Sequence, residues 1–230
     1  MAKFNFIELD KTILPKTKGM RVDGHRFYNI DGTNYPSVTT VLGIRKTEQL
    51  KEWRQKIGEN VAKWEMGRAA RRGKSFHTLV EQYIKGETPS IRDVLPLGLF
   101  KLLKPYIDQI DNIHLLEAIM YSKKLTIAGQ VDCIAEYNGK LSVIDFKTAN
   151  KERQESWIDN YFLQTTAYAQ MYEETYGKSI DQIVILLASE DGSVQNFIKE
   201  KKDFMSPLMK SIDEFYKYYQ EQNKDKIKQD

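Results

Sequence analysis

The chain has one cysteine, Cys133, among its 230 residues. A single thiol excludes an intramolecular disulfide framework, and it also excludes an iron–sulfur cluster held by four cysteines. No apolar run approaches the ~18 residues that a membrane-spanning helix requires, so we expect no membrane partner. The first residues lack both the apolar segment of a secretory signal and an Arg- and Ser-rich, acid-poor transit pattern, and this predicts a cytoplasmic protein.

Internal repeats and low-complexity linkers are absent as well. A chain of 230 residues, with 41% hydrophobic and 29% charged residues, can bury a substantial core as one domain. We therefore expect a single domain over residues 1–230, acting as a monomer.

The formal net charge of +3 is small but unevenly distributed. Residues 45–74 contain ten Lys or Arg and four Glu, a local charge of +6, so the rest of the chain carries −3. Such a stretch is typical of a solvated helix face. It also suits a surface that neutralises a polyanion, because it ends shortly before His77 with Arg68, Arg71, Arg72 and Lys74.

Hydrophobic periodicity predicts an α/β protein. Alternation around Asp31-Gly32 indicates a small hairpin over residues 26–35. The strands expected elsewhere cover residues 113–125, 183–188 and 194–198, besides a second hairpin described below. A short helix is expected to start at Ser37, with Ser37 as its N-cap. The other predicted helices cover residues 47–66, 74–85, 99–110, 157–176 and 203–222.

The second hairpin is centred on Asn138-Gly139 and is the most informative feature of the chain. Both residues tolerate the positive φ angles of a type I′ turn. If they form the loop, Asp132 lies opposite Asp145, and Lys147 lies on the same face. Two carboxylates with Cβ atoms roughly 5 Å apart repel each other unless a cation lies between them.

This hairpin has two interpretations. A surface hairpin with ordinary salt bridges explains poorly why Asp145 interrupts an apolar strand. A metal centre explains it better, since hard carboxylate oxygens select Mg²⁺ or Mn²⁺ over zinc. Such a metal activates water and neutralises charge at a phosphodiester, and Lys147 can hold the water or stabilise the phosphate. Cys133 has the opposite parity and is expected in the core.

The motif Asp132…Asp145-Phe146-Lys147 resembles that of the PD-(D/E)xK nuclease superfamily. Further segments occur in the order typical of its RecB-like branch of genome-maintenance exonucleases, which has mitochondrial, bacterial and phage members. These segments are Pro36-Ser37-Val38-Thr39, Gly73-Lys74-Ser75-Phe76-His77, Val131-Asp132-Cys133-Ile134-Ala135-Glu136-Tyr137 with Gly139-Lys140-Leu141, and Leu163-Gln164 with Ala167-Tyr168. The likeness covers residues 35–191, and leaves out an N-terminal extension, residues 1–34, and a polar tail, residues 223–230.

The resemblance implies a restriction-endonuclease-like α/β core, in which helices flank a central mixed β-sheet. It also implies a metal-dependent DNA exonuclease that prefers single-stranded DNA, in a bacterial or phage-infected cell. Duplex-end resection, structure-specific endonuclease activity and a catalytically inactive nucleic-acid-binding module are the alternatives. The intact set of Asp132, Asp145 and Lys147 argues against an inactive module.

The same resemblance implies roles for single residues. It makes His77 and the Phe146 carbonyl metal ligands beside Asp132 and Asp145, although a histidine on an apolar helix face is usually a core residue. It makes Gln164 the residue that orients the lysine or the scissile phosphate, because an amide can accept from one and donate to the other. It makes Tyr168 a DNA contact, where the residues alone indicate a polar pair on a helix surface.

Other candidates are less specific. Glu81 shares a helix face with His77 and is either an outer partner of the metal or an ion pair with Lys85. Ser37 and Thr39, at a helix N-terminus, can bind a backbone phosphate, although capping alone explains Ser37. Trp53 and Trp64 can stack on bases, but their spacing in the predicted helix favours core burial for at least one.

Overall fold

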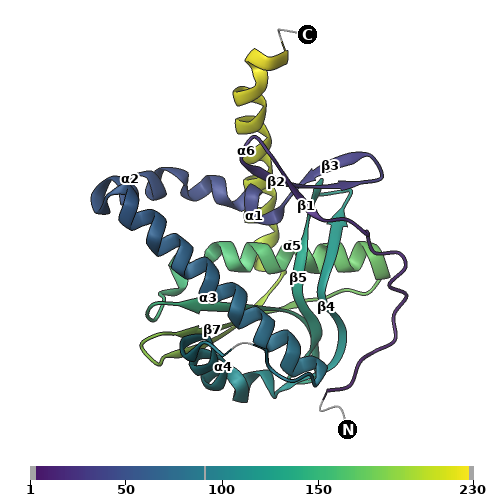
Figure 1. The fold of residues 1–230 in the computed structure, drawn as a ribbon. Coiled ribbons are helices and arrows are strands. Elements are labelled where there is room, and N and C mark those ends of the chain that lie inside the picture. The colour runs from purple at the N-terminus through teal and green to yellow at the C-terminus, as the bar shows by residue number, and fades with distance from the viewer. Residues whose placement is uncertain (1–3, 91, 228–230) are drawn as a thin grey trace.

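The computed structural model describes residues 4–90 and 92–227, with side chains as far as residue 222. Its centre is a five-stranded sheet in which neighbouring strands follow the order of the sequence (Figure 1). The strands are β4 (Ile110–Ser122), β5 (Ile127–Tyr137), β6 (Lys140–Ala149), β7 (Gln182–Ser189) and β8 (Val194–Glu200). All pairs are antiparallel except β6 and β7. The predicted mixed sheet flanked by helices is confirmed.

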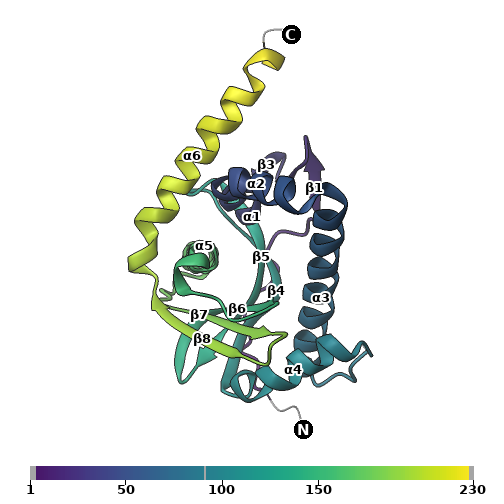
Figure 2. The same cartoon turned by 90° about the vertical axis from the view of Figure 1, so that its left-hand side faces the viewer.

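The parallel pair β6–β7 requires a crossover connection. A 3₁₀ turn (Glu155–Trp157) and helix α5 (Asp159–Tyr176) form it, and α5 ends at Gly177, whose φ of 68° is left-handed, as the sequence predicts. In Figure 2, α5 is seen end-on inside the curve of the sheet. Ten of its eighteen residues are buried, so this helix is enclosed by the core on that side.

Helices α3 (Glu59–Lys85) and α4 (Val94–Ile107) cover the outer face of the sheet (Figure 2). Phe76, Leu79 and Ile84 of α3 pack there on Leu103 of α4, and Cys133 lies in the same cluster. Core packing of the single cysteine is therefore confirmed. The helix predicted from residue 99 starts five residues earlier, at Val94.

The N-terminal part forms its own antiparallel sheet of β1 (Gly19–Val22), β2 (His25–Ile30) and β3 (Thr33–Pro36), with Asp31 and Gly32 as the predicted two-residue turn. Helix α1 (Val38–Gly43) and a 3₁₀ turn (Ile44–Lys46) follow. Helix α6 (Lys202–Ile227) packs on α5 and then projects beyond the fold (Figure 1). Of the predicted polar tail, residues 223–227 continue α6, and residues 228–230 lie outside the described residues.

The predicted helices over residues 47–66 and 74–85 were divided at the wrong place. The break falls at Gly58, whose φ of 86° and ψ of 144° separate α2 (Thr47–Ile57) from α3. Helix α3 then continues through Gly67 and Gly73, because a helical glycine costs only about 1 kcal/mol and packing offsets that cost. Trp64 of the predicted apolar stripe is 57% exposed. No helix in the described part of the chain is long and apolar enough to cross a membrane.

Candidate active site

The two aspartates meet where β5 and β6 separate. The ladder between these strands runs from Tyr137↔Lys140 to Cys133↔Ile144, the register expected from the Asn-Gly turn, and stops one pair short of Asp132 and Asp145. The Phe146 backbone N–H donates to Asp132 Oδ2 at 2.9 Å. Both carboxylates are buried, Asp145 almost completely. The predicted pair therefore exists, and Asp132 binds the backbone of the neighbouring strand.

Lys147 lies against Asp145, as its spacing predicts. Its Nζ lies 2.7 Å from Asp145 Oδ1 and 2.6 Å from Oδ2, and it stands 5.1 Å from the centre of the Tyr161 ring. Burial raises the pKa of Asp145, whereas the pKa of Lys147 is raised by the adjacent carboxylates against the opposing effect of burial. Although it touches the ammonium, Asp145 Oδ2 has no well-oriented hydrogen bond among the described residues. A carboxylate oxygen has more than one lone pair, so Oδ2 can accept a ligand beside Lys147.

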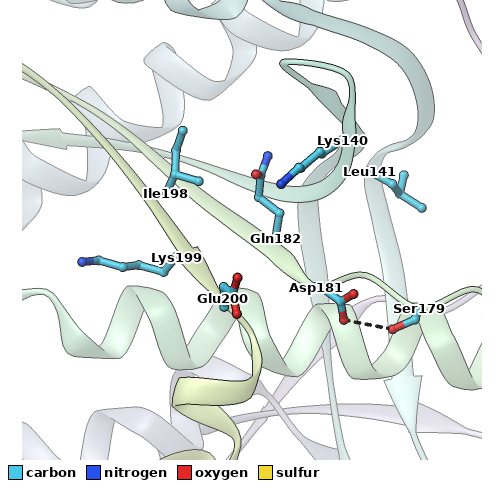
Figure 3. Close-up of a pocket in the computed structure, with 8 residues that line it drawn as sticks. All are labelled: Lys140, Leu141, Ser179, Asp181, Gln182, Ile198, Lys199 and Glu200. Atoms are coloured by element: carbon cyan, nitrogen blue, oxygen red, sulfur yellow. Dashed lines mark hydrogen bonds between the residues drawn. The ribbon is translucent and has the colours of Figure 1, made fainter.

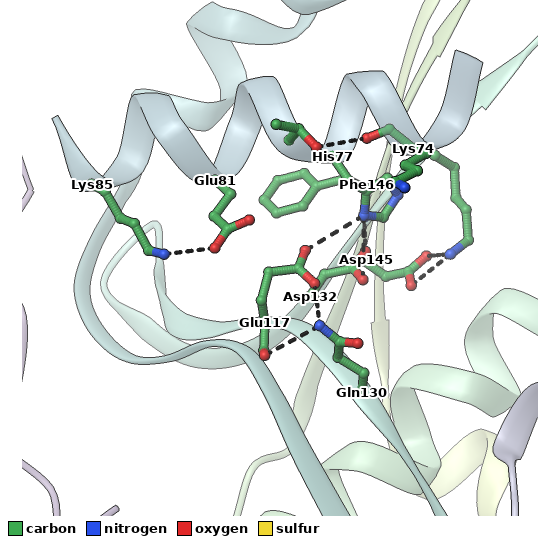
Figure 4. Close-up of polar contacts among 11 residues, drawn as sticks. Lys74, His77, Glu81, Lys85, Glu117, Gln130, Asp132, Asp145 and Phe146 are labelled. Carbon is green, nitrogen blue, oxygen red and sulfur yellow. Dashed lines mark hydrogen bonds and ion pairs between the residues drawn. The ribbon is translucent and has the colours of Figure 1, made fainter. Parts of the chain in front are cut away.

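His77 comes from α3 and points from that helix toward Asp132 and Glu117 (Figure 4). Its Nδ1 lies 3.5 Å from Asp132 Oδ1 and 3.7 Å from Glu117 Oε1. Burial lowers the pKa of His77, but Asp132 and Glu117 outweigh this effect and raise it to about 9. One donor atom of each of these three residues lies within 4.8 Å of the others. An imidazole and two carboxylates at this spacing fit a divalent metal.

Only two of the four predicted metal ligands lie in this three-residue cluster. His77 and Asp132 belong to this three-residue cluster, while the Asp145 carboxylate is directed to Lys147. Phe146 uses its N–H at the site, and the ligand role of its carbonyl stays a prediction.

Glu117 of β4 is the site residue that sequence reasoning missed. The pairs Leu116↔Cys133 and Ala118↔Val131 place it opposite Asp132. Its φ of 49° is unusual for a side-chain-bearing strand residue, and such conformations cost about 1–3 kcal/mol and concentrate at functional sites. Gln130 Nε2 donates to Glu117 Oε2 at 2.8 Å. Glu117 could have been found from the sequence only if the pairing of β4 with β5 were known. The four-residue turn between these strands contains no dipeptide typical of hairpins, so the sequence does not reveal that pairing.

Arg72 is buried, which does not support its predicted contact with a DNA phosphate. Its Nε donates to Thr148 Oγ1 at 3.1 Å, its Nη1 donates to Asn150 Oδ1 at 2.6 Å, and it forms an ion pair with Glu190, which also binds Arg68. Arg72 shares the inward face of α3 with Phe76, one turn further along, and this explains its burial. The hydrogen bonds from the two arginines lower the pKa of Glu190 against the effect of burial.

The other two of the four cations that end the basic stretch, Arg71 and Lys74, are exposed on α3. Their contact with DNA stays a prediction.

Gln164 and Tyr168 of α5 point into the core and are nearly inaccessible. Tyr168 hydrogen-bonds to Gln164, and its pKa is raised by burial and by Asp132 and Asp145. A Cβ atom at Gly129 would lie 2.6 Å from the Tyr168 hydroxyl, so glycine is needed where the ring meets β5. This placement supports Tyr168 as the residue that positions Gln164, and does not support the predicted DNA contact.

The remaining candidates occupy ordinary positions. Glu81 forms an ion pair with Lys85 at 2.6 Å, the simpler of its two interpretations. Ser37 Oγ accepts from the Thr40 N–H at 3.0 Å and caps α1 as predicted, while Thr39 is exposed. Phosphate binding by Ser37 and Thr39 stays a prediction.

A hollow elsewhere on the sheet is not part of the candidate active site. A hollow of about 590 Å³ is lined by Lys140 and Gln182, the first residues of β6 and β7, with Lys199 and Glu200 of β8 (Figure 3). Asp145 and Lys147 lie further along β6, toward its other end. The lining side chains carry both signs of charge, so this hollow is not a candidate for polyanion binding.

A mixed sheet that carries Asp132 and Asp145-Phe146-Lys147 on adjacent strands defines a class of protein. The model of the PD-(D/E)XK nuclease superfamily matches residues 44–229, and the chain belongs to this superfamily. Its members are nucleases that use divalent metal ions.

Particular relatives share this chain's sequence more closely. The mitochondrial genome maintenance exonuclease 1 of Homo sapiens is 33% identical over 173 residues, which cover 69% of this chain and 50% of that protein. The proteins of the same name from Mus musculus and Xenopus tropicalis are 28% identical over 172 residues and 29% identical over 177 residues. They too match 69% of this chain, and 51% and 49% of their own length respectively. The chain thus spans about half the length of the curated relatives it matches.

Proposed function

We propose that the protein is a DNA exonuclease that requires Mg²⁺ or Mn²⁺ and degrades single-stranded DNA from an end. The observation that carries this proposal is the cluster of His77, Glu117 and Asp132 beside the buried Asp145–Lys147 pair. The cluster offers ligands for a hard cation, and the pair offers a fixed positive charge next to it.

Each side chain then has a defined role. His77, Glu117 and Asp132 hold the metal, and Asp145 contributes Oδ2, which Lys147 also contacts. The bound metal supplies Lewis acidity and lowers the pKa of water. The raised pKa of Lys147 keeps its ammonium protonated at neutral pH, so it orients water and stabilises the phosphate as a cation instead of acting as a base.

Gln164 completes the arrangement from the side of α5. Its amide is held by Tyr168, whose ring is fixed against Gly129. An amide at this position can accept from the lysine and donate to a phosphate oxygen. Gln164 therefore positions the reacting groups.

The preference for single strands and ends is supported by the surface beside the site and by the relatives. Arg71 and Lys74 are exposed on α3. Trp64 is also exposed, and the centre of its ring lies 5.7 Å from Arg68 Cζ. Exposed aromatic and basic side chains together suit stacked, unpaired bases and their phosphates. The curated relatives are named exonucleases.

Digestion of end-labelled DNA tests the proposal. Linear and covalently closed single strands and duplexes are incubated with Mg²⁺, Mn²⁺ or EDTA, with Asp145→Asn as the inactive control. We expect the wild type to cleave linear single strands only when Mg²⁺ or Mn²⁺ is present. We expect no cleavage by Asp145→Asn. Efficient cutting of closed circles would replace the proposal with an endonuclease, and preferential duplex resection would replace its strand preference. Absence of any metal-dependent cleavage would leave a nucleic-acid-binding module.

A further inference from the structure

A basic hollow lies between the start of α2 and the start of α5. It has a volume of about 410 Å³, within the range of about 300–1,000 Å³ that is usual for small-molecule sites. Two cations, Arg45 and Lys46, come from the turn before α2, and Arg153 comes from the loop after β6. The rest of the wall consists of Gln49, Ser156, Trp157, Asp159 and Asn160.

The positive charge of this hollow is only partly balanced by the protein. Within the described residues none of its three cations forms a salt bridge, in contrast to Arg68 and Arg72. Arg45 Nη1 donates to Asn160 Oδ1 at 3.2 Å, and Lys46 Nζ donates to the Trp157 carbonyl at 3.1 Å. These partners are uncharged, so they orient the cations without cancelling their charge.

The cations are also close enough to repel one another. Burial lowers the pKa of Lys46, Asp159 raises it, and both Arg45 and Arg153 lower it further. Three positive charges with one nearby carboxylate leave a net charge of about +2 around one hollow. Like charges gathered in a concave site raise the local concentration of anions and are stabilised by binding one.

This hollow adjoins the candidate active site through α5. Asn160 lines the hollow, and the next residue, Tyr161, places its ring under Lys147. Gln164 follows one helical turn further along. Trp157, at the rim, is 50% exposed, so its ring presents a free face beside the cations.

We propose that the hollow is a nucleotide subsite for single-stranded DNA next to the cleavage site. A backbone phosphate binds Arg45, Lys46 and Arg153, and the attached base stacks on Trp157. Stacking is tolerant of sequence because every base has a π-face, so the subsite holds the strand without reading it. This assignment rests on the proposed function and adds to it the residues that place the strand.

Binding measurements without cleavage test the phosphate contact. A fluorescent single-stranded oligonucleotide is titrated in EDTA at several salt concentrations with Lys46→Gln/Arg153→Gln. The control is Lys140→Gln/Lys178→Gln. It removes two exposed cations, one at the start of β6 and one just after the end of α5, away from the hollow. We expect weaker binding by the first variant and a log–log salt slope shallower by up to about 0.7, the contribution of one phosphate contact on single strands. Affinity and slope equal to those of the control would overturn the subsite.

The stacking contact is tested independently with Trp157→Ala, whose exposed ring can be removed without opening the core. Oligonucleotides with a single abasic site at successive positions are titrated against both proteins. For the wild type, we expect one position at which the missing base weakens binding roughly 5- to 150-fold, the range of base–aromatic stacking. Trp157→Ala should lose sensitivity at that position only. A flat abasic profile, or one unchanged by Trp157→Ala, would refute the stacking.

The two proposals fail separately. If the wild type cuts DNA with metal and the variants bind like the control, the subsite is wrong and the exonuclease stands. If no metal supports cleavage but Lys46→Gln/Arg153→Gln still weakens binding, the hollow binds DNA in a protein of another function. Should that double variant not fold, as judged by its melting curve, the abasic profile of Trp157→Ala decides alone.

Discussion

Replacement of Glu190 should separate a buried ion pair from an exposed one within the same network. The Glu190 carboxylate binds Arg72, whose side chain is 6% exposed, and Arg68, whose side chain is 32% exposed. In Glu190→Gln the Arg72 guanidinium stays buried with only neutral partners, Thr148 and Asn150. Removal of one member of a buried pair costs about 3–5 kcal/mol, since the other charge is left uncompensated. In Arg68→Gln a half-exposed partner is lost, which costs about 0–1 kcal/mol.

The melting temperatures of the two variants should differ clearly. For a protein of this size, 1 kcal/mol shifts Tm by about 2–4 °C. Glu190→Gln should therefore melt about 6–20 °C below the wild type, and Arg68→Gln no more than about 4 °C below it. Both are measured in EDTA by calorimetry, so that metal binding does not contribute. Equal, small shifts for the two variants would refute the view that Arg72 depends on this carboxylate.

Glu190→Gln should also raise the concentration of Mn²⁺ that half-maximal cleavage requires. Arg72 and His77 lie on one helix, and Arg72 ties that helix to Thr148, the residue after Lys147. Without the Glu190 carboxylate, Arg72 and its helix are held less firmly, so His77 is held less well against Asp132, and more Mn²⁺ is needed for half-maximal cleavage. A purely structural role would lower the fraction of folded protein and leave that half-maximal concentration unchanged. Arg68→Gln, with its half-exposed side chain, is the matched control.

Three further outcomes are expected. Gly129→Ala should cost about 1–3 kcal/mol by overpacking, because its Cβ meets the Tyr168 hydroxyl at 2.6 Å, and Tyr168→Phe should recover part of that loss in a double-variant cycle followed by thermal melting. Glu117→Gln should reduce the rise in Tm produced by Mn²⁺, and an unchanged rise would exclude Glu117 as a ligand. Burial lowers the pKa of His114, so the folded state resists protonation. Stability should therefore fall as pH drops below about 6.5, and His114→Asn should flatten this dependence in urea titrations. An unchanged pH dependence in this variant would contradict the role of His114.

Local chemistry made part of the site predictable. The Asn-Gly turn sets the register of β5 against β6, because only residues that accept positive φ fit a two-residue loop. That register alone places Asp132, Asp145 and Lys147 on one face, and the structure retains it. Gly177 at the end of α5 and Ser37 at the start of α1 follow from similarly local rules. In each case the deciding contacts lie within a few residues in the sequence.

Features that depend on distant contacts were not predictable in the same way. Glu117 joins the site through a strand pairing whose turn has no readable signature, and through a φ angle that no local rule requires. Arg72 looked like part of a solvated basic stretch until Glu190, more than a hundred residues away, proved to be its partner. The site thus combines a locally determined hairpin with a helix, a third strand and the ion pairs of Arg68 and Arg72 with Glu190. Their positions follow from tertiary packing, because the energies that select them arise between segments that meet only in the folded chain.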